Sequence, residues 1–204
     1  MTTPDISLTL FNSIFDNKTD KRIDLSDFDA FERVLYELSK KTRQSKKDAE
    51  LMSPATYKAN TTRANDNVIE WAGWCCVDID DYEFKGELKD DLIRKFPDWK
   101  FICYSTASST EASPKFRLVF PLTRAVPREN IRNFWYALQT ELGDVADRQT
   151  KDLSRMYYIP GKYAGGLSAC LAGWLAGSPG WLAGGLGGSP VGPGSWPRMG
   201  HNLV

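Results

Sequence analysis

Cys76-Val77-Asp78-Ile79-Asp80-Asp81 joins a predicted strand to a group of acidic residues, because an apolar run over residues 74–77 leads directly into three carboxylates. Successive residues of a β-strand point to opposite faces. Asp78 and Asp80 therefore share one face with Cys76. The opposite face carries the apolar side chains that can be buried, which are Cys75, Val77 and Ile79.

Two carboxylates on one face of this strand suggest a metal site. Asp78 and Asp80 would lie about 7 Å apart along the strand, close enough to hold a common divalent cation. Asp-x-Asp is a common pattern, however. The alternative is that Asp80 and Asp81 simply begin a polar turn.

Length and charge limit the class of protein. The chain has 204 residues, which is enough for one full-sized domain or for one domain with appendages. Its 26 Lys and Arg residues balance its 26 Asp and Glu residues. The absence of a global basic field argues against a protein that coats nucleic acid by bulk charge. A local basic groove remains compatible with this composition.

Cysteine and histidine usage argues against a zinc site. None of the four cysteines forms a Cys-x-x-Cys pair, and the single histidine is His201. Cys75 and Cys76 read as buried free thiols, which suits a reducing compartment. With neither a signal sequence at the N-terminus nor an apolar run of membrane-spanning length, we expect a cytoplasmic protein without a membrane partner.

Hydrophobic periodicity predicts three helices and several strands. A first helix begins at Ser26, which can cap it with Asp29 three residues on. Further helices are expected over residues 87–96 and 127–142, the last ended by Gly143. Strands are expected over residues 71–79, 100–105, 115–122 and 155–160, and residues 52–67 read as a long loop. Residues 6–15 suggest an edge strand or an arm.

This order of elements predicts an α/β (α+β) domain. A helix precedes the series strand, helix, strand, strand, helix, strand, which is typical of a compact mixed or antiparallel sheet with packed helices, as in ferredoxin-like folds. The domain is expected to span residues 1–164. Residues 165–204 are rich in Gly, Ala and Trp and are expected to form a flexible tail.

Cations and hydroxyls gather around the strand over residues 115–122. Lys115 and Arg117 lie on its polar face, beside a hydroxyl-rich loop over residues 106–113. This combination would suit a triphosphate, although both cations could equally be ordinary solvent-facing residues. The five cations within residues 40–47 form either a solvated helix end or a contact surface for a nucleic-acid backbone.

The chain resembles the catalytic core of archaeo-eukaryotic-type primases, in the primase–polymerase branch of phages and plasmids. That family carries an Asp-hydrophobic-Asp strand, a small-x-His element and a later hydrophobic-Asp. The first corresponds to Asp78-Ile79-Asp80 and the third to Ala146-Asp147. The second falls on residues 104–110, followed by an Arg-bearing strand that ends in Pro-Leu. The resemblance covers roughly residues 71–160 and implies an RRM-like or ferredoxin-like core.

The resemblance implies a DNA-templated nucleotidyltransferase, a primase or DNA-directed polymerase, that acts on nucleoside triphosphates and single-stranded DNA. Two-metal phosphoryl transfer would use Mg²⁺ or Mn²⁺ held by the catalytic residues Asp78, Asp80 and Asp147. The nucleotide would be bound by Ser108, Ser109, Lys115, Arg117 and Arg155. A phage-encoded chain would work in the host cytoplasm.

One family residue is missing. The family's histidine would fall near Ser109, and residues 1–164 contain no histidine. Serine donates a hydrogen bond to a phosphate but carries no charge, so Lys115 and Arg117 would supply the charge instead.

Two other classes of function stay open. A metal-dependent nuclease would use the same carboxylates to cut, and a non-catalytic module would bind nucleic acid or a replication partner. The sequence holds no Gly-x-x-x-x-Gly-Lys-Ser/Thr loop. A replicative helicase is therefore expected either to be a separate partner or to have been lost with the C-terminus.

Overall fold

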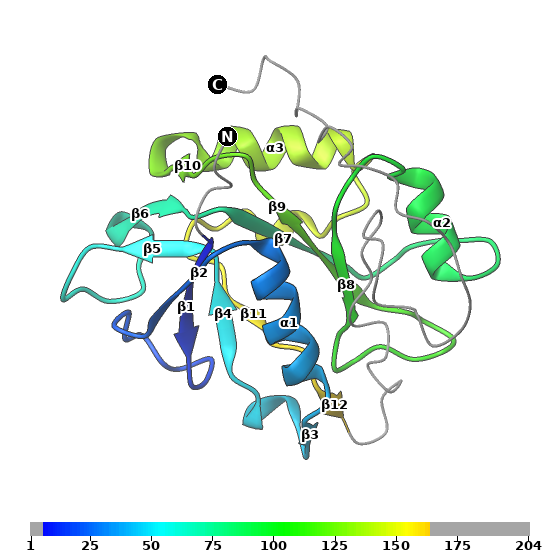
Figure 1. Ribbon diagram of the computed structural model, residues 1–204, viewed down its shortest axis with the longest axis horizontal. Helices are drawn as coiled ribbons and strands as arrows, with labels where there is room; N and C mark the ends of the chain where they lie inside the picture. Colours follow the sequence, from blue (N-terminus) through cyan, green and yellow to red (C-terminus); the bar gives the residue numbers. More distant parts are fainter. Residues whose placement is uncertain (1–5, 164–204) are drawn as a thin grey trace.

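The structure is a computed structural model that describes residues 6–163 (Figure 1). This part of the chain contains three α-helices, which are α1 (Phe28–Ser39), α2 (Leu88–Lys95) and α3 (Ile131–Glu141). Its strands are β1 (Ile6–Phe11), β2 (Arg22–Leu25), β3 (Thr42–Arg43), β4 (Leu51–Ser53), β5 (Ala55–Tyr57), β6 (Val68–Trp71), β7 (Trp74–Ile79), β8 (Ile102–Ser105), β9 (Phe116–Pro121), β10 (Val126–Pro127), β11 (Tyr157–Tyr158) and β12 (Lys162–Tyr163).

The central sheet has the strand order β7-β9-β8, and both pairings are antiparallel. Strands β7 and β8 therefore run parallel on either side of β9, and the segment that contains α2 crosses from one to the other. This is the split βαβ arrangement of ferredoxin-like folds. The predicted α/β class with antiparallel pairing is confirmed. The register places Asp78 opposite Arg117.

Both faces of the central sheet are buried, whereas the alternation in β7 predicts burial only for the face that carries Cys75, Val77 and Ile79. Cys75, Val77 and Ile79 pack with residues of α2 and α3 on one face. On the other face, Trp74 and Cys76 pack with residues of α1, β1 and β4. In Figure 1, α3 accordingly lies above this sheet and α1 below it. Asp78 lies on the α1 side, among apolar and aromatic neighbours.

Helix α1 begins one residue later than the capping box predicts. Asp27, rather than Ser26, is the N-cap, and its carboxylate accepts a hydrogen bond of 2.7 Å from the amide of Ala30. The Ser26 hydroxyl instead donates to the Asp27 carboxylate, at 2.9 Å. Because a carboxylate at this position also interacts favourably with the helix dipole, Asp27 makes the stronger cap.

We expect Asp27→Ala to lower the free energy of unfolding by about 1 kcal/mol, the usual cost of losing a helix cap. Urea denaturation of the variant and of the wild type measures this difference. Ser26→Ala is the matched control and is expected to cost less than half as much, because Ser26 bonds only to the cap. Equal costs for the two variants would mean that the cap was assigned to the wrong residue.

Three expectations for the flanking segments are wrong. Strand β1 is not at an edge, because it lies between β4 and β2 in a four-stranded sheet of order β11-β4-β1-β2. Residues 52–67 are not one loop, since they contain most of β4, all of β5 and a short 3₁₀ helix. The strand expected over residues 155–160 is reduced to β11, which pairs with β4 rather than with the central sheet.

The remaining elements follow the prediction more closely. Helix α3 starts after a 3₁₀ turn over Arg128–Asn130, and Gly143 follows it with a φ of 74°, a conformation that glycine adopts at low cost. The expected tail over residues 165–204 lies outside the described residues. In the part of the chain that the structure describes, no helix combines the length and the apolar character needed to cross a membrane.

Candidate functional site

A cavity of about 490 Å³ lies at the carboxyl end of β7, on the face of the sheet that carries Asp78. It is lined by five cations and four carboxylates among other residues. The full lining is Ile14, Lys46, Leu51, Arg63, Asp78, Asp80, Thr106, Ser108, Lys115, Arg117, Asp147, Asp152, Ser154, Arg155, Met156 and Tyr158.

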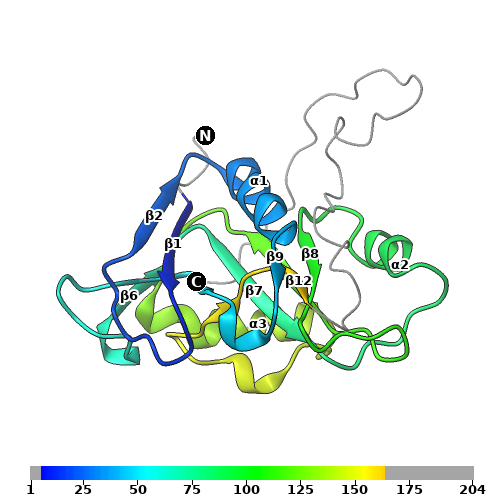
Figure 2. The ribbon, with the colours of Figure 1, turned by 90° about the horizontal axis from the view of Figure 1, so that it is seen from below.

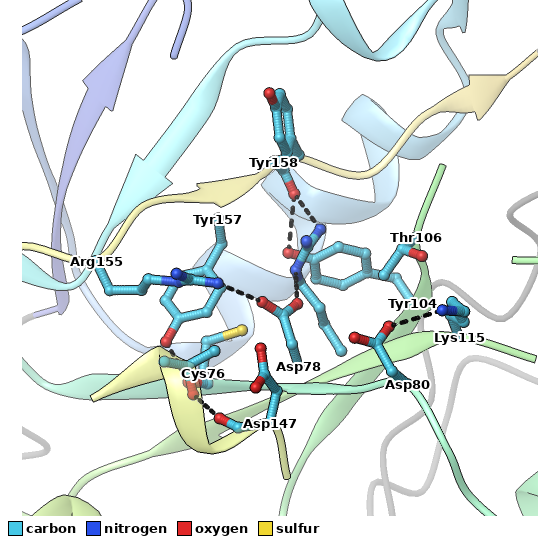
Figure 3. Close-up of polar contacts among 12 residues, drawn as sticks. Cys76, Asp78, Asp80, Tyr104, Thr106, Lys115, Asp147, Arg155, Tyr157 and Tyr158 are labelled. Atoms are coloured by element: carbon cyan, nitrogen blue, oxygen red, sulfur yellow. Dashed lines mark hydrogen bonds and ion pairs between the residues drawn. The ribbon is translucent and has the colours of Figure 1, made fainter. Parts of the chain in front are cut away.

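Asp78 is held between two arginines, of which Arg155 is labelled in Figure 3. Its Oδ1 forms an ion pair with Nε of Arg117, the residue opposite it on β9. Its Oδ2 lies 3.4 Å from Nη2 of Arg155. The side chains of Asp78 and Arg117 are only 11% and 8% exposed, so this is a buried ion pair. The idea that Arg117 is an ordinary solvent-facing residue is wrong.

Hydrogen bonds to the backbone of β11 help to fix the orientation of Arg117. The carbonyl of Tyr158 accepts hydrogen bonds from Arg117 Nη1, at 3.0 Å, and from the Tyr104 hydroxyl, at 3.2 Å. The Tyr157 hydroxyl donates to the carbonyl of Cys76, at 2.6 Å. Strand β11 is thereby joined to the central sheet through side chains, although no backbone ladder connects them.

The surroundings of Arg117 keep this residue charged and keep the nearby Tyr104 and Tyr157 neutral. Burial is the largest single effect and acts to lower the pKa of Arg117, but the charge and hydrogen bond of Asp78, together with Tyr104 and Cys76, raise that pKa above its ordinary value. Burial raises the pKa of the Tyr104 and Tyr157 hydroxyls well above their ordinary value. Tyr104 and Tyr157 therefore act as hydrogen-bond donors and do not titrate near neutral pH.

A backbone hydrogen bond brings Asp147 to the end of β7. Its amide donates to the carbonyl of Asp78, at 2.9 Å. The carbonyl of Asp147 in turn accepts from the Thr150 hydroxyl, at 2.6 Å, and from its amide, at 3.1 Å. The Asp147 side chain lines the same cavity as Asp78 and Asp80. The structure thus brings together three carboxylates from two distant parts of the sequence.

Asp80 and its neighbours form the outer part of the cavity. Asp80 lies 3.6 Å from Nζ of Lys115, and both side chains are partly exposed. The hydroxyls of Thr106 and Ser108 are 3.3 Å apart and line the cavity nearby. Lys115 and Ser108 are thus placed at the cavity.

Ser109 is the one predicted site residue that does not reach the cavity. It is buried, and its hydroxyl accepts a hydrogen bond of 2.9 Å from the amide of Lys115. Its side chain therefore closes the loop between β8 and β9. The loop is therefore stabilised internally at this position.

The carboxylate oxygens of the cavity are the type of ligand that a hard divalent cation prefers. Asp78 Oδ1 is buried and, within residues 6–163, accepts no hydrogen bond beyond its ion pair with Arg117. In that part of the chain, no three His, Cys, Asp or Glu side chains stand in an arrangement that could hold a metal ion together. Mg²⁺ is commonly bound by one or two carboxylates, with waters and substrate phosphates as the other ligands. The cavity suits that mode of binding.

Several lining residues were not predicted as site residues. Arg63 comes from the segment between β5 and β6, and Lys46 from the segment between β3 and β4, where its Nζ lies 4.8 Å from the centre of the Tyr158 ring. Asp152 and Ser154 precede Arg155. The sequence shows Lys46 and Arg63 as cations in polar segments, but nothing in their spacing places them beside Asp78.

The fold and the cavity together define a mixed α/β domain with a charged site at the end of its central sheet. The family model described as the VapE N-terminal domain matches residues 28–167, which is more than half of the chain. The chain belongs to this family, which is found in phage and plasmid replication-associated proteins. No curated protein and no solved structure matches the chain.

Proposed function

We propose that the chain is a nucleotidyltransferase of phage or plasmid replication, a primase or polymerase that joins nucleoside triphosphates on a single-stranded DNA template. The observation that carries this proposal is the meeting of Asp78, Asp80 and Asp147 in one cavity with several cations. Carboxylates and cations side by side suit a reaction in which a triphosphate is bound and attacked.

The cations and hydroxyls of the cavity suit a triphosphate. Lys115 and Arg155 are partly exposed, so their side chains can turn to phosphate oxygens. Charge-assisted contacts of this kind are the strong hydrogen bonds of proteins. The hydroxyls of Thr106 and Ser108 add neutral donors. Arg117 already contacts Asp78 and the carbonyl of Tyr158. Its positive charge would therefore act on a bound phosphate through space, without a direct contact.

The carboxylates would hold Mg²⁺ or Mn²⁺, which when bound would activate the attacking hydroxyl and stabilise the leaving pyrophosphate. Asp78, Asp80 and Asp147 line the same cavity and would share this ligand role, with Asp78 also in contact with two arginines. The arginines also offset the repulsion between Asp78 and its acidic neighbours, which would otherwise disfavour joint ionisation.

The two arginine contacts of Asp78 also favour a second candidate. A carboxylate that is neutralised within the protein is a weaker metal ligand, so the same cavity would suit a non-catalytic module that binds nucleic acid. The missing family histidine points in the same direction. Both functions place nucleic acid at this cavity, and they differ in whether nucleotides are joined.

Incorporation of labelled nucleotides separates these functions. The full chain is incubated with single-stranded DNA, with and without a primer, in the presence of Mg²⁺ or Mn²⁺. A polymerase extends or creates labelled products, a nuclease shortens the DNA, and a binding module does neither. We expect metal-dependent extension.

Asp80→Asn is the loss-of-function control for this assay, since it removes one charge and keeps the shape of the side chain. The variant is expected to lose extension while it stays folded. Extension by the wild type in the presence of a chelator would contradict the proposal, as would wild-type rates for Asp80→Asn.

A further inference from the structure

The turn between β1 and β2 holds a large apolar side chain out in the solvent. Phe15 is 92% exposed, and its neighbour Ile14 is 50% exposed. Single exposed apolar residues are ordinary on protein surfaces. These two are consecutive, however, and Ile14 lines the cavity that contains Asp78. The turn therefore places an exposed aromatic ring beside the rim of the site.

Hydrogen bonds give this turn a defined shape. The Asp16 carboxylate accepts from the amides of Asn12, at 2.9 Å, and Lys18, at 3.1 Å. The bond from the Asn12 amide, followed by that from Lys18, lowers the pKa of Asp16 below its ordinary value. The Asp16 amide donates to the carbonyl of Ser13, at 3.0 Å. Phe15 thus sits on a preorganised turn, and its exposure does not come from a frayed loop.

Further contacts fix this turn against the wall of the cavity. The Asn17 carbonyl accepts from the amide of Arg63, at 2.9 Å, and the Thr19 hydroxyl donates to the carbonyl of Thr61, at 2.7 Å. Arg63 itself lines the cavity. The turn carrying Phe15 and the segment carrying Arg63 therefore form one unit (blue and cyan, lower left in Figure 1).

A second tie runs from this unit to the segment that carries Arg155. The Asn65 side-chain oxygen accepts from the amide of Ser154, at 3.1 Å, and from its hydroxyl, at 2.8 Å. Arg155, the next residue, contacts Asp78. Phe15 is connected to the acidic centre through this short series of bonds, and its position relative to the cavity is set. In Figure 2 the β1–β2 hairpin projects at one end of the molecule, away from α2.

We propose that Phe15 is a stacking platform for a base of single-stranded nucleic acid as the strand enters the cavity. An aromatic face accepts any base, while cations along the path contact the backbone. Lys18 and Lys21 follow Phe15 in the same hairpin, and both are exposed. Arg63 and Lys46 continue this series of cations into the cavity. This inference rests on the proposed function for the identity of the strand as a template.

This combination favours nucleic acid over a protein partner. A protein docking site needs a contiguous apolar patch, whereas Phe15 and Ile14 stand among polar and charged neighbours. An exposed ring with two exposed lysines in the same hairpin instead offers one stacked base and two phosphate contacts. The cavity beyond it is polar, so the strand would continue there through its backbone.

Binding of fluorescein-labelled oligothymidylate, measured by anisotropy at fixed salt, tests this proposal. We expect Phe15→Ala to weaken binding roughly fivefold to a hundredfold, the range for loss of one base–aromatic stack. Phe15→Trp is expected to bind at least as tightly as the wild type. Phe15→Leu keeps the apolar area but lacks the aromatic face, so it should behave like Phe15→Ala. Wild-type affinity for Phe15→Leu or Phe15→Ala would overturn the proposal.

An abasic scan sharpens this test. Oligonucleotides with one abasic position each are bound to the wild type and to Phe15→Ala. At the position that stacks on Phe15, the losses of binding free energy from the abasic site and from Phe15→Ala should not add, because both changes remove the same contact. Additive losses at every position would overturn the stacking assignment.

Tyr136→Ala is the matched control. Tyr136 is 54% exposed on α3, which covers the opposite face of the central sheet, so this variant should bind as the wild type does. Nucleotide incorporation by the wild type separates the two proposals. If the wild type incorporates nucleotides and Phe15→Ala binds the oligonucleotide as tightly as the wild type, only the proposed stacking role of Phe15 is wrong. If binding depends on Phe15 but the wild type incorporates no nucleotides, only the proposed nucleotidyltransferase activity is wrong.

Discussion

Arg117→Ala is expected to lower the free energy of unfolding by about 3 kcal/mol, the lower end of the range for removing one partner of a buried ion pair. The variant leaves Asp78 buried with Arg155 as its remaining cation, at 3.4 Å. It also leaves the carbonyl of Tyr158 with one donor fewer. Urea denaturation of the full chain measures the change.

The control for this variant is an ion pair whose arginine is exposed. Arg94 lies 3.2 Å from Asp91 on α2, and its side chain is 65% exposed. Exposed pairs contribute less than about 1 kcal/mol, so Arg94→Ala should be close to neutral. If Arg117→Ala were as stable as Arg94→Ala, Arg117 would have no structural role and would be available as an ordinary phosphate ligand.

Asp147→Asn is expected to lower nucleotide incorporation by at least about a hundredfold, the usual cost of removing one preorganised charge from a reaction centre. The substitution keeps the size of the side chain. It also leaves the bonds made by the backbone amide and carbonyl of Asp147. The melting temperature should therefore change little, and initial rates of primer extension reveal the loss.

Two measurements make the Asp147 prediction specific. Mn²⁺ should raise the melting temperature of the wild type, because a ligand that binds the folded state stabilises it, and should raise that of Asp147→Asn less. Thr150→Ala removes the bond that shapes the loop and should lower incorporation less than Asp147→Asn. Equal stabilisation of the wild type and Asp147→Asn by Mn²⁺ would contradict a metal-binding role for Asp147.

The central part of the fold could be predicted because its local signals agree. In β7 and β9 the residue alternation specifies which side chains share a face, and the stripe of α1 matches its packing against Trp74. The flanking sheets could not be predicted in the same way. Strands β4 and β5 are three residues each, too short to show a period, and they form because distant partners pair with them.

The site was predictable where a residue follows a strong strand signal. Asp78, Lys115 and Arg117 belong to or adjoin β7 and β9, and all three line the cavity. The role of Arg117 as the buried partner of Asp78 was not predictable, since it depends on the register between two strands. Ser109 was predicted to bind the nucleotide but bonds to the amide of Lys115. A hydroxyl in a polar loop bonds as readily to nearby backbone groups as to a ligand.

The pairing of β11 with β4 has a consequence for how the chain folds. Met52 is paired with Tyr157. Strand β4 is synthesised about a hundred residues before β11, so the two strands can pair only after β11 has been synthesised. The wall of the cavity is incomplete until then. Such distant contacts slow folding, because the entropy of closing a long loop is lost before the contact forms. During synthesis, Asp78 would emerge before Arg117 and Arg155. The acidic centre would therefore acquire its counter-charges only in the last stage of assembly.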